Sequence, residues 1–189
     1  MADKIERDRD NQLDELLARQ EILARLTAFS RGMDRFDREA YMSAFHPDAE
    51  TAAGPFVGSA ADCWDWAVPM HEAYQSATQH SLLNLTIEFD GDIAHSECYY
   101  MFVAKNRDDT LVLAGGRYID RFEKRDGAWK IALRTNAIEW ACQPPAIPLP
   151  FADVSGVTDN GAPARDRSDP SYRRPLTNLR PPSNPAEPG

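Results

Sequence analysis

Two residues of this 189-residue chain, Asp34 and His80, are of types that together can move a proton. An imidazole is neutral near pH 7 and can accept a proton. A carboxylate bonded to it holds the ring in one tautomer and stabilises the imidazolium that forms. Asp34 ends a segment with periodic apolar residues, and His80 opens a run in which apolar and polar residues alternate. If the fold brings the two side chains together, the pair predicts a general base.

The segment that must position Asp34 is a long amphipathic helix over residues 11–33. Its apolar residues recur at spacings of three and four, which is typical of one buried helical face. These residues are Leu13, Leu16, Leu17, Ile22, Leu23, Leu26, Phe29 and Met33. Gly32 permits the backbone to leave helical geometry, which places Asp34 at or just after the C-terminus. Because the negative end of the helix dipole lies there, the carboxylate needs a cationic or hydrogen-bond-donating partner.

Further helices and a set of strands follow. Asp37 predicts the N-cap of a short helix that Pro47 stops, and residues 60–75 predict a helix interrupted at Pro69. From His80 onward the apolar period changes to two, with tight turns between the runs. The predicted strands cover residues 80–89, 93–104, 111–123 and 129–140. An antiparallel meander after paired helices predicts an α+β domain.

The direction of the His80 side chain depends on the register of its strand. His80 shares its parity with Asn84, Thr86 and Glu88, which form the more polar face. It therefore points into the protein only if it precedes the regular strand or if a β-bulge shifts the register.

The two ends of the chain differ from its middle. Residues 1–10 form a charged N-terminal arm without the apolar segment of a secretory signal. Residues 11–142 hold the α+β domain, and residues 143–189 hold 11 of the 14 prolines. A proline-rich segment cannot form a core of its own, so we expect an extended tail.

The net charge and the cysteine content limit the classes of partner and the compartment that we expect for this chain. The net charge of −9 argues against a nucleic-acid or membrane surface, since either would require clustered Lys and Arg. Cys63, Cys98 and Cys142 have no spacing typical of a zinc site or a disulfide framework, which suits a reducing cytoplasm. No apolar run approaches the roughly 18 residues of a membrane span. We expect a cytoplasmic protein that handles a hydrophobic small molecule.

Two phrases carry a resemblance to a known family. The phrase GMDRFDREAYMSAFHPDAE, then His80, then the phrase GGRYIDRFEKRDGAWKIALR resemble the SnoaL-like branch of the nuclear transport factor 2-like (cystatin-like cone) superfamily. The sequence is most similar to hexachlorocyclohexane dehydrochlorinase, and more distantly to scytalone dehydratase and bile-acid 7α-dehydratase. The resemblance covers roughly residues 13–140. It implies a cone-shaped barrel in which a curved antiparallel sheet packs on N-terminal helices, and it favours a homo-oligomer, specifically a trimer.

The resemblance also implies catalytic residues. In those enzymes a histidine removes a proton from the substrate and an aspartate orients that histidine. The resemblance implies that His80 and Asp34 take these two roles. Arg134 matches a cavity cation that helps the leaving group depart, although a surface salt bridge is an equally open interpretation of the residue alone. Phe29 stands where the dehydrochlorinase has a lysine and the bile-acid dehydratase a tyrosine, so the inner pocket is more apolar in this chain.

Further residues are predicted to line the pocket, and plain core packing is the alternative for each aromatic one. The predicted lining residues are Phe29, Trp64, Trp66, Tyr99, Met101, Asn136 and Ile138. Tyr99, or else Tyr41 or Tyr118, could supply the hydroxyl that is missing at Phe29.

The remaining histidines raise the question of a metal. His46, His71 and His95 match no ligand spacing and are interpreted as structural or exposed. The expectation is therefore no metal and no cofactor.

The function expected from the resemblance is a cofactor-independent lyase or dehydratase acting on a hydrophobic, ring-containing substrate of aromatic, steroid-like or polyketide-like type. Loss of formaldehyde from a lignin-derived aromatic diol belongs to the same class of elimination. One alternative is an isomerase or cyclase that uses the same base. Another is a non-catalytic small subunit of a ring-hydroxylating dioxygenase.

Overall fold

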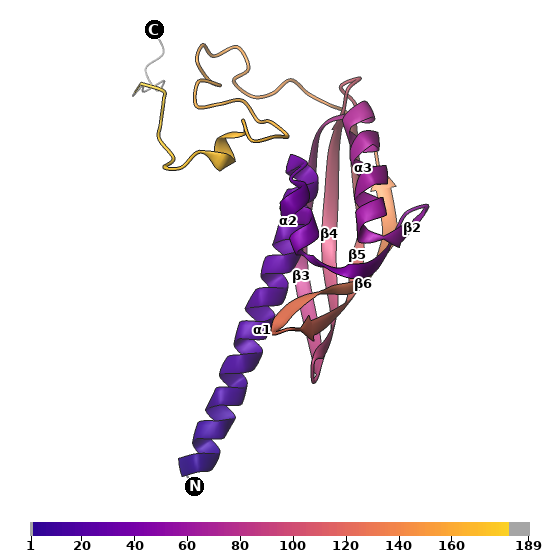
Figure 1. Cartoon of the computed structure of the whole chain (residues 1–189). Coiled ribbons are helices and arrows are strands. Elements are labelled where there is room, and N and C mark those ends of the chain that lie inside the picture. Colours follow the sequence, from indigo (N-terminus) through magenta and orange to yellow (C-terminus); the bar gives the residue numbers. More distant parts are fainter. Residues whose placement is uncertain (1, 182–189) are drawn as a thin grey trace. The chain divides into compact units, whose positions relative to one another are not determined.

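The computed structural model describes residues 2–181, except the side chains of residues 2–5, 7 and 8. The chain forms two compact units, Met1–Pro145 and Ala146–Gly189. Residues 182–189 of the predicted tail, and Met1 of the predicted arm, lie outside the described residues. The first unit holds helices α1, α2 and α3 together with a six-stranded sheet (Figure 1).

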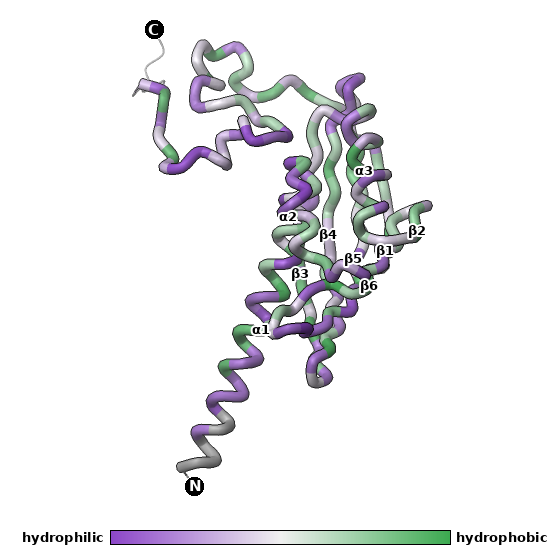
Figure 2. The backbone as a smooth tube through the Cα atoms, viewed as in Figure 1, coloured by the Kyte–Doolittle hydropathy of each residue, from purple (hydrophilic) through white to green (hydrophobic). Residues whose placement is uncertain are grey.

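Helix α1, Ala2–Arg35, begins well before the predicted start and includes the charged segment that we expected to be an arm. Its C-terminal half buries Ile22, Leu26, Phe29 and Met33 on one face. The prediction that the whole apolar set is buried was wrong, since Leu13, Leu16, Leu17 and Leu23 are exposed. For Leu13, Leu16 and Leu17 the physical reason is length, because the N-terminal half of α1 extends beyond the end of the sheet (Figure 1). Leu23 lies in the C-terminal half, on a side of the helix that is not buried. Hydrophilic residues predominate in the part of the N-terminal half that Figure 2 colours.

The end of α1 differs from the prediction in a way that matters for Asp34. The helix continues through Arg35, and Phe36, at φ +51°, adopts the left-handed conformation that ends it. The Asp37 N–H donates to the Gly32 carbonyl at 2.9 Å, as in a Schellman motif. Gly32 therefore does not break the helix. A Cβ there would lie 2.4 Å from the Tyr41 nitrogen, so the glycine permits α1 to pack closely on α2.

Helix α2, Arg38–Ser43, is capped as predicted, because the Asp37 side chain accepts from the Ala40 N–H at 3.2 Å. The helix ends earlier than expected. Strand β1, Phe45–Ala53, already contains Pro47, and it pairs through a short turn with β2, Phe56–Ser59.

Helix α3, Ala60–Tyr74, runs without interruption through Pro69, which corrects the predicted break. Pro69 lies on the exposed side of the helix, as does Asp65, whose carbonyl loses its helical donor. Water can satisfy that carbonyl, so the helix continues. The buried side of α3 carries Cys63, Ala67 and His71 at a spacing of four.

Four long strands form the meander. They are β3, Gln75–Asp90; β4, Ile93–Asn106; β5, Leu111–Arg125; and β6, Ala128–Cys142. The sheet order is β2-β1-β6-β5-β4-β3, and the β1–β6 pairing is parallel. The α+β fold and the curved sheet are confirmed, but the sheet is open, so it is not a closed barrel. The apolar core lies between the sheet and the helices.

A β-bulge in β3 sets the direction of His80. The pairing of β3 with β4 shifts by one residue between Leu82 and Leu85. Because side chains alternate along a strand, this shift places His80 on the face opposite to that expected from Thr86 and Glu88. The condition under which His80 would point inward is therefore met.

The second unit consists of turns and extended segments with a single 3-10 turn, Pro170–Tyr172, within its described residues. The buried Asp169 side chain organises this unit by accepting from the Ser171 and Ala164 N–H groups, each at 2.9 Å. The unit therefore has local order despite its many prolines.

Candidate active site

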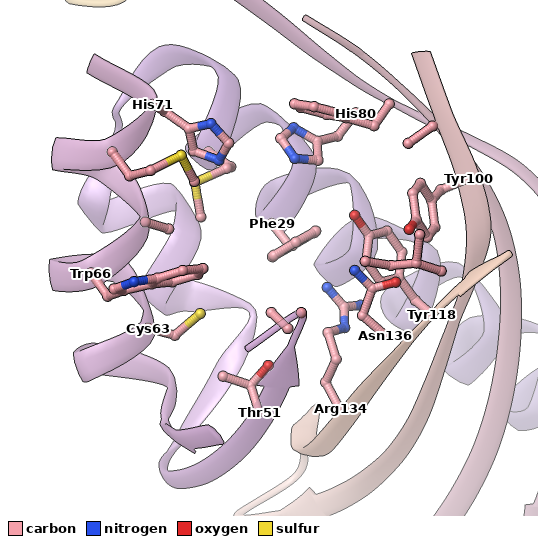
Figure 3. Close-up of a pocket in the computed structure, with 18 of the residues that line it drawn as sticks. Phe29, Thr51, Cys63, Trp66, His71, His80, Tyr100, Tyr118, Arg134 and Asn136 are labelled. Carbon is pink, nitrogen blue, oxygen red and sulfur yellow. The ribbon is translucent and has the colours of Figure 1, made fainter. Parts of the chain in front are cut away.

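A cavity of about 280 Å³ lies between the helices and the sheet, near the lower end of the roughly 300–1,000 Å³ that small-molecule sites occupy. Its wall is mainly apolar, with a few polar groups from different elements (Figure 3). Those groups include Tyr41, Thr51, His71, His80, Tyr100, Tyr118, Arg134 and Asn136. Such a wall suits a hydrophobic ligand that is oriented by a few directed contacts.

Asp34 and His80 meet at one end of this cavity. His80 Nδ1 lies 2.6 Å from Asp34 Oδ1, and the His80 backbone N–H donates to Asp34 Oδ2 at 2.9 Å. The Asp34 side chain is 13% exposed and the His80 side chain is 10% exposed. One carboxylate therefore holds both the ring and the backbone of His80, and the two donors supply the partner that an acid in the last turn of a helix needs.

The contacts of His80 determine which ring nitrogen faces the cavity. A carboxylate can only accept, so Nδ1 carries the proton and Nε2 of the neutral ring keeps a lone pair. The Ser30 hydroxyl donates to the His80 carbonyl at 2.5 Å, and the Phe102 ring packs 4.7 Å from the imidazole. These contacts fix the ring, and Figure 3 shows it directed over the cavity.

Arg134 lies at the opposite end of the cavity and is buried. Its guanidinium forms a two-point ion pair with Asp120: Nε to Oδ1 and Nη2 to Oδ2, each 2.7 Å. Among the described residues, the third nitrogen, Nη1, has no hydrogen-bond partner. The surface salt bridge considered for Arg134 is therefore wrong, and one donor of a buried cation remains available.

Aromatic rings surround the Arg134 guanidinium. Its central carbon lies 4.1 Å from the centre of the Phe29 ring and 4.4 Å from that of Tyr118. Burial acts to lower the pKa of Arg134, but the charge and hydrogen bonds of Asp120 raise it above its ordinary value. Phe29 thus packs its ring against a buried cation.

Three tyrosines lie in the wall, and burial raises the pKa of each: Tyr41, Tyr100 and Tyr118. Tyr100 and Tyr118 stack with ring centres 4.4 Å apart. A hydrogen bond with Asn136 acts to lower the pKa of Tyr100 but does not offset burial. These phenols are donors that stay neutral at ordinary pH.

The structure places four predicted pocket residues in the cavity wall: Phe29, Trp66, Asn136 and Ile138. Three others lie outside it. Tyr99, 43% exposed, and Met101 occupy the opposite face of β4, and their neighbours Tyr100 and Phe102 line the cavity instead. Trp64 packs in the core against the Tyr41 ring, at 5.0 Å between ring centres. The errors on β4 come from parity, since a shift of one residue exchanges the two faces.

Two further polar residues were missed as site residues. Asp120 could be suspected only as an acid that shares its strand parity with Tyr118 and Phe122. Its pairing with Arg134 depends on a register shift between Arg121 and Phe122. His71 was interpreted as structural or exposed, yet it lies buried in the cavity wall. Its spacing of four from Ala67 on α3 was the available signal.

The other two histidines match their interpretation. His46 is buried and its Nε2 lies 2.8 Å from the Glu123 carbonyl, whereas His95 is exposed. In residues 2–181, no three His, Cys, Asp or Glu side chains gather as metal ligands would. In the same range, no helix is both long enough and apolar enough to cross a bilayer.

A curved open sheet and helices around an apolar cavity define the nuclear transport factor 2-like class, also called cystatin-like. Residues 14–135 match the SnoaL-like domain family, so this chain belongs to that family. No curated protein sequence matches the chain.

Solved structures share the fold. A type 2 hexachlorocyclohexane dehydrochlorinase is 20% identical over 76% of this chain and 99% of its own, with a TM-score of 0.67. A candidate scytalone dehydratase from Novosphingobium aromaticivorans is 20% identical over 73% of this chain and 93% of its own, with a TM-score of 0.60. A protein of unknown function with a cystatin-like fold from Nostoc punctiforme is 23% identical over 65% and 92%, with a TM-score of 0.56. At these identities the likeness shows the fold alone.

Proposed function

We propose that this chain is a lyase that eliminates a small group, such as water, from a hydrophobic ring-containing substrate. The observation that carries the proposal is the 2.6 Å contact of Asp34 Oδ1 with Nδ1 of His80, a residue that lines an apolar cavity. The dehydrochlorinase and the candidate dehydratase among the structural neighbours support an elimination over other reactions of the same base.

In the proposed reaction, His80 Nε2 takes a proton from a substrate carbon. The electron pair of that C–H bond forms a double bond to the neighbouring carbon, and the leaving group departs with the electrons of its own bond. Asp34 stabilises the resulting imidazolium. When the leaving group is hydroxide, it receives the proton from His80 and departs as water, which restores the neutral base.

Arg134 acts at the other end of the cavity. Its Nη1 donor is oriented by the ion pair with Asp120, and it would stabilise negative charge on a departing or carbonyl oxygen. A guanidinium does not deprotonate near neutral pH, so this group supplies charge and His80 moves the proton. The neutral phenol of Tyr100 could donate to the same oxygen.

A second candidate function is an isomerase or cyclase, in which His80 returns the proton to another carbon. The unpartnered Arg134 Nη1 donor favours it, because this group could hold an enolate oxygen. Elimination lowers the mass of the substrate, whereas isomerisation leaves it unchanged and introduces deuterium from heavy water.

The test incubates the chain with ring compounds that bear a hydroxyl or halogen next to an acidic C–H, followed by mass spectrometry of the products. With a substrate found in this way, His80→Asn should lower turnover about 10²–10⁴-fold, the usual contribution of a general base. The matched control His95→Asn changes an exposed histidine and should keep full turnover. Full activity in a folded His80→Asn protein would refute the mechanism.

The assembly and location remain predictions. We propose a homotrimer in the cytoplasm that works without a cofactor. Light scattering after size-exclusion chromatography measures the assembly, and co-purification with a larger iron–sulfur subunit would favour the dioxygenase alternative.

A further inference from the structure

Thr51 is a polar residue of the cavity wall to which the proposed elimination gives no role. It lines the cavity and is only 3% exposed. Among residues 2–181, its hydroxyl has no hydrogen-bond partner. Figure 3 shows this hydroxyl on the side of Thr51 that faces the cavity. Because buried polar groups are as a rule hydrogen-bonded, such a hydroxyl is available to a ligand in the cavity.

The pairing of strands β1 and β6 places Thr51 beside Arg134. The two residues are register partners in the parallel pairing of these strands. Neighbouring strands lie about 4.8 Å apart, and partners in register direct their side chains to the same face of the sheet. Both side chains are buried, whereas the preceding partners, Glu50 and Leu133, are exposed. Thr51 and Arg134 therefore present polar groups to the same end of the cavity.

The charges around the cavity favour an uncharged ligand group at this end. Asp120 already balances the charge of Arg134 through two bonds of 2.7 Å each. Asp34, bonded to His80, adds a second carboxylate at the other end. A ligand carboxylate would therefore bring a further negative charge into an apolar cavity whose cation is already paired, and burying such a charge is costly.

The hydrogen-bonding capacity of the two groups indicates a carbonyl oxygen. Arg134 Nη1 can only donate, and the hydroxyl of Thr51 has one proton to donate. A carbonyl oxygen has two lone pairs and accepts from both groups, so neither buried donor is left without a partner. A ligand hydroxyl would instead accept from Arg134 and donate to Thr51, which would leave the Thr51 proton without an acceptor.

We propose that Thr51 determines substrate specificity, because its hydroxyl and Arg134 Nη1 together bind the carbonyl oxygen of an uncharged ring ketone. The inference deepens the proposed function and rests on it only in assigning this cavity to the substrate. A carbonyl withdraws electrons from the ring that carries it, which favours removal of a substrate proton by His80. Two donors on that oxygen strengthen this withdrawal.

The experiment measures binding instead of turnover, with three single-ring probes in titrations followed by NMR. Acetophenone carries the carbonyl, α-methylstyrene has a CH2 group in place of its oxygen, and benzoate carries a charged carboxylate. We expect the unchanged chain to bind acetophenone about 10-fold or more tightly than either other probe, since one of the two hydrogen bonds comes from a charged group. Thr51→Val keeps the shape of the side chain but not the hydroxyl. It should weaken acetophenone binding about 2–10-fold and leave α-methylstyrene binding nearly unchanged.

Two control variants should keep the full preference for acetophenone. Thr51→Ser retains a hydroxyl at the same place. Thr135→Val is the matched control, since it changes an exposed threonine next to Arg134 on β6.

Stability separates a binding role of Thr51 from a merely structural one. A hydroxyl without a partner in the protein contributes no bond to the fold, so Thr51→Val should unfold at the same urea concentration as the unchanged chain or at a higher one. Thr51→Ala also lacks the hydroxyl, and it replaces Thr51→Val in the titrations if that protein does not fold.

Three results would overturn the inference: acetophenone does not bind, it binds no more tightly than α-methylstyrene or benzoate, or the variant without the Thr51 hydroxyl keeps the full preference. Each is read with His80 and Asp34 intact. A failure of the elimination mechanism would appear instead as full turnover in His80→Asn. The two failures are therefore distinguishable.

Discussion

The two ends of the cavity use the same device in different surroundings. At each end a carboxylate binds a nitrogen-containing side chain: Asp34 binds the imidazole of His80, and Asp120 binds the guanidinium of Arg134. The Asp34 and His80 side chains are 13% and 10% exposed, whereas those of Asp120 and Arg134 are 0% and 2% exposed. The first pair contains an imidazole, which can act as a base, whereas the guanidinium of the second stays protonated and keeps its charge.

This difference teaches what each aspartate contributes. Asp34 accepts from a neutral ring and a backbone N–H, so its loss should disturb orientation and the stabilisation of a transient charge. Asp120 neutralises a permanent charge in the protein interior, so its loss should leave a bare buried cation. The first aspartate should matter for turnover and the second for folding.

The largest expected effect is on turnover at the Asp34 end. Asp34→Asn removes the negative charge beside His80 and permits the ring to adopt other tautomers, so kcat should fall about 10²–10⁴-fold. Its free energy of unfolding should change by less than about 2 kcal/mol, because the amide oxygen can still accept one bond. Steady-state kinetics and urea denaturation measure the two quantities. A folded Asp34→Asn protein with normal kcat would remove the distinction between the two ends.

The next effect is on stability at the Asp120 end. Asp120→Ala should lower the free energy of unfolding by about 3–5 kcal/mol, because it leaves the buried charge of Arg134 without its counter-charge. The matched control is Glu97→Ala, which breaks a partly exposed pair with Arg117 on the same sheet and should cost no more than about 1 kcal/mol. Urea denaturation of both variants measures the two losses of stability. Equal losses would contradict the conclusion that the buried pair matters more for folding than the partly exposed one.

A third effect appears at alkaline pH. Burial raises the pKa of Tyr41 and Tyr118, so these phenols keep their protons when folded. The unfolded chain loses them near pH 10, so the stability they contribute is complete below that pH and falls above it. Two such groups give a slope of up to about 2.7 kcal/mol per pH unit.

Denaturation curves recorded between pH 9 and pH 11 test this slope, with phenolate absorbance as the second signal. Phenolate from Tyr41 and Tyr118 should appear together with unfolding. Single variants to Phe should each reduce the slope by about half. An unchanged slope in both variants would show that these tyrosines do not control alkaline stability.

The smallest expected change in stability comes from removing both charges at the Arg134 end. Replacing a buried ion pair by apolar residues of similar volume is often neutral or stabilising. We therefore expect the free energy of unfolding of the double variant, Asp120→Leu with Arg134→Met, to lie within about 1–2 kcal/mol of that of the parent chain. Turnover should stay low, because the Nη1 donor is gone. Recovery of stability and turnover together would contradict the role proposed for Arg134.

Much of the fold could be predicted from local patterns. The spacing of Leu26, Phe29 and Met33 predicted the buried face of α1, and Asp37 predicted the start of α2. The alternation after His80 predicted the long strands. These signals are local, because the 3.6-residue and two-residue periods come from backbone geometry. The parallel pairing of β1 with β6 had no comparable signal, since it joins segments distant along the chain.

The candidate site was predicted less completely. The resemblance to the family suggested Asp34, His80 and Arg134, and the structure places all three in or beside one cavity. It did not suggest Asp120 or His71, and Tyr99 and Met101 were assigned to the wrong face of β4. Each of these errors concerns the direction of a side chain or its partner across strands.

The sequence by itself determined the class of fold, the residue types able to move a proton and the apolar character of their surroundings. Only the tertiary structure decided that His80 faces the cavity and that Arg134 pairs with Asp120. The physical reason is that both depend on one-residue shifts in strand pairing, at Leu82 to Leu85 in β3 and at Arg121 to Phe122 in β5. Such a shift reverses every side chain beyond it, and it is selected by packing against neighbouring elements, which the local sequence does not contain.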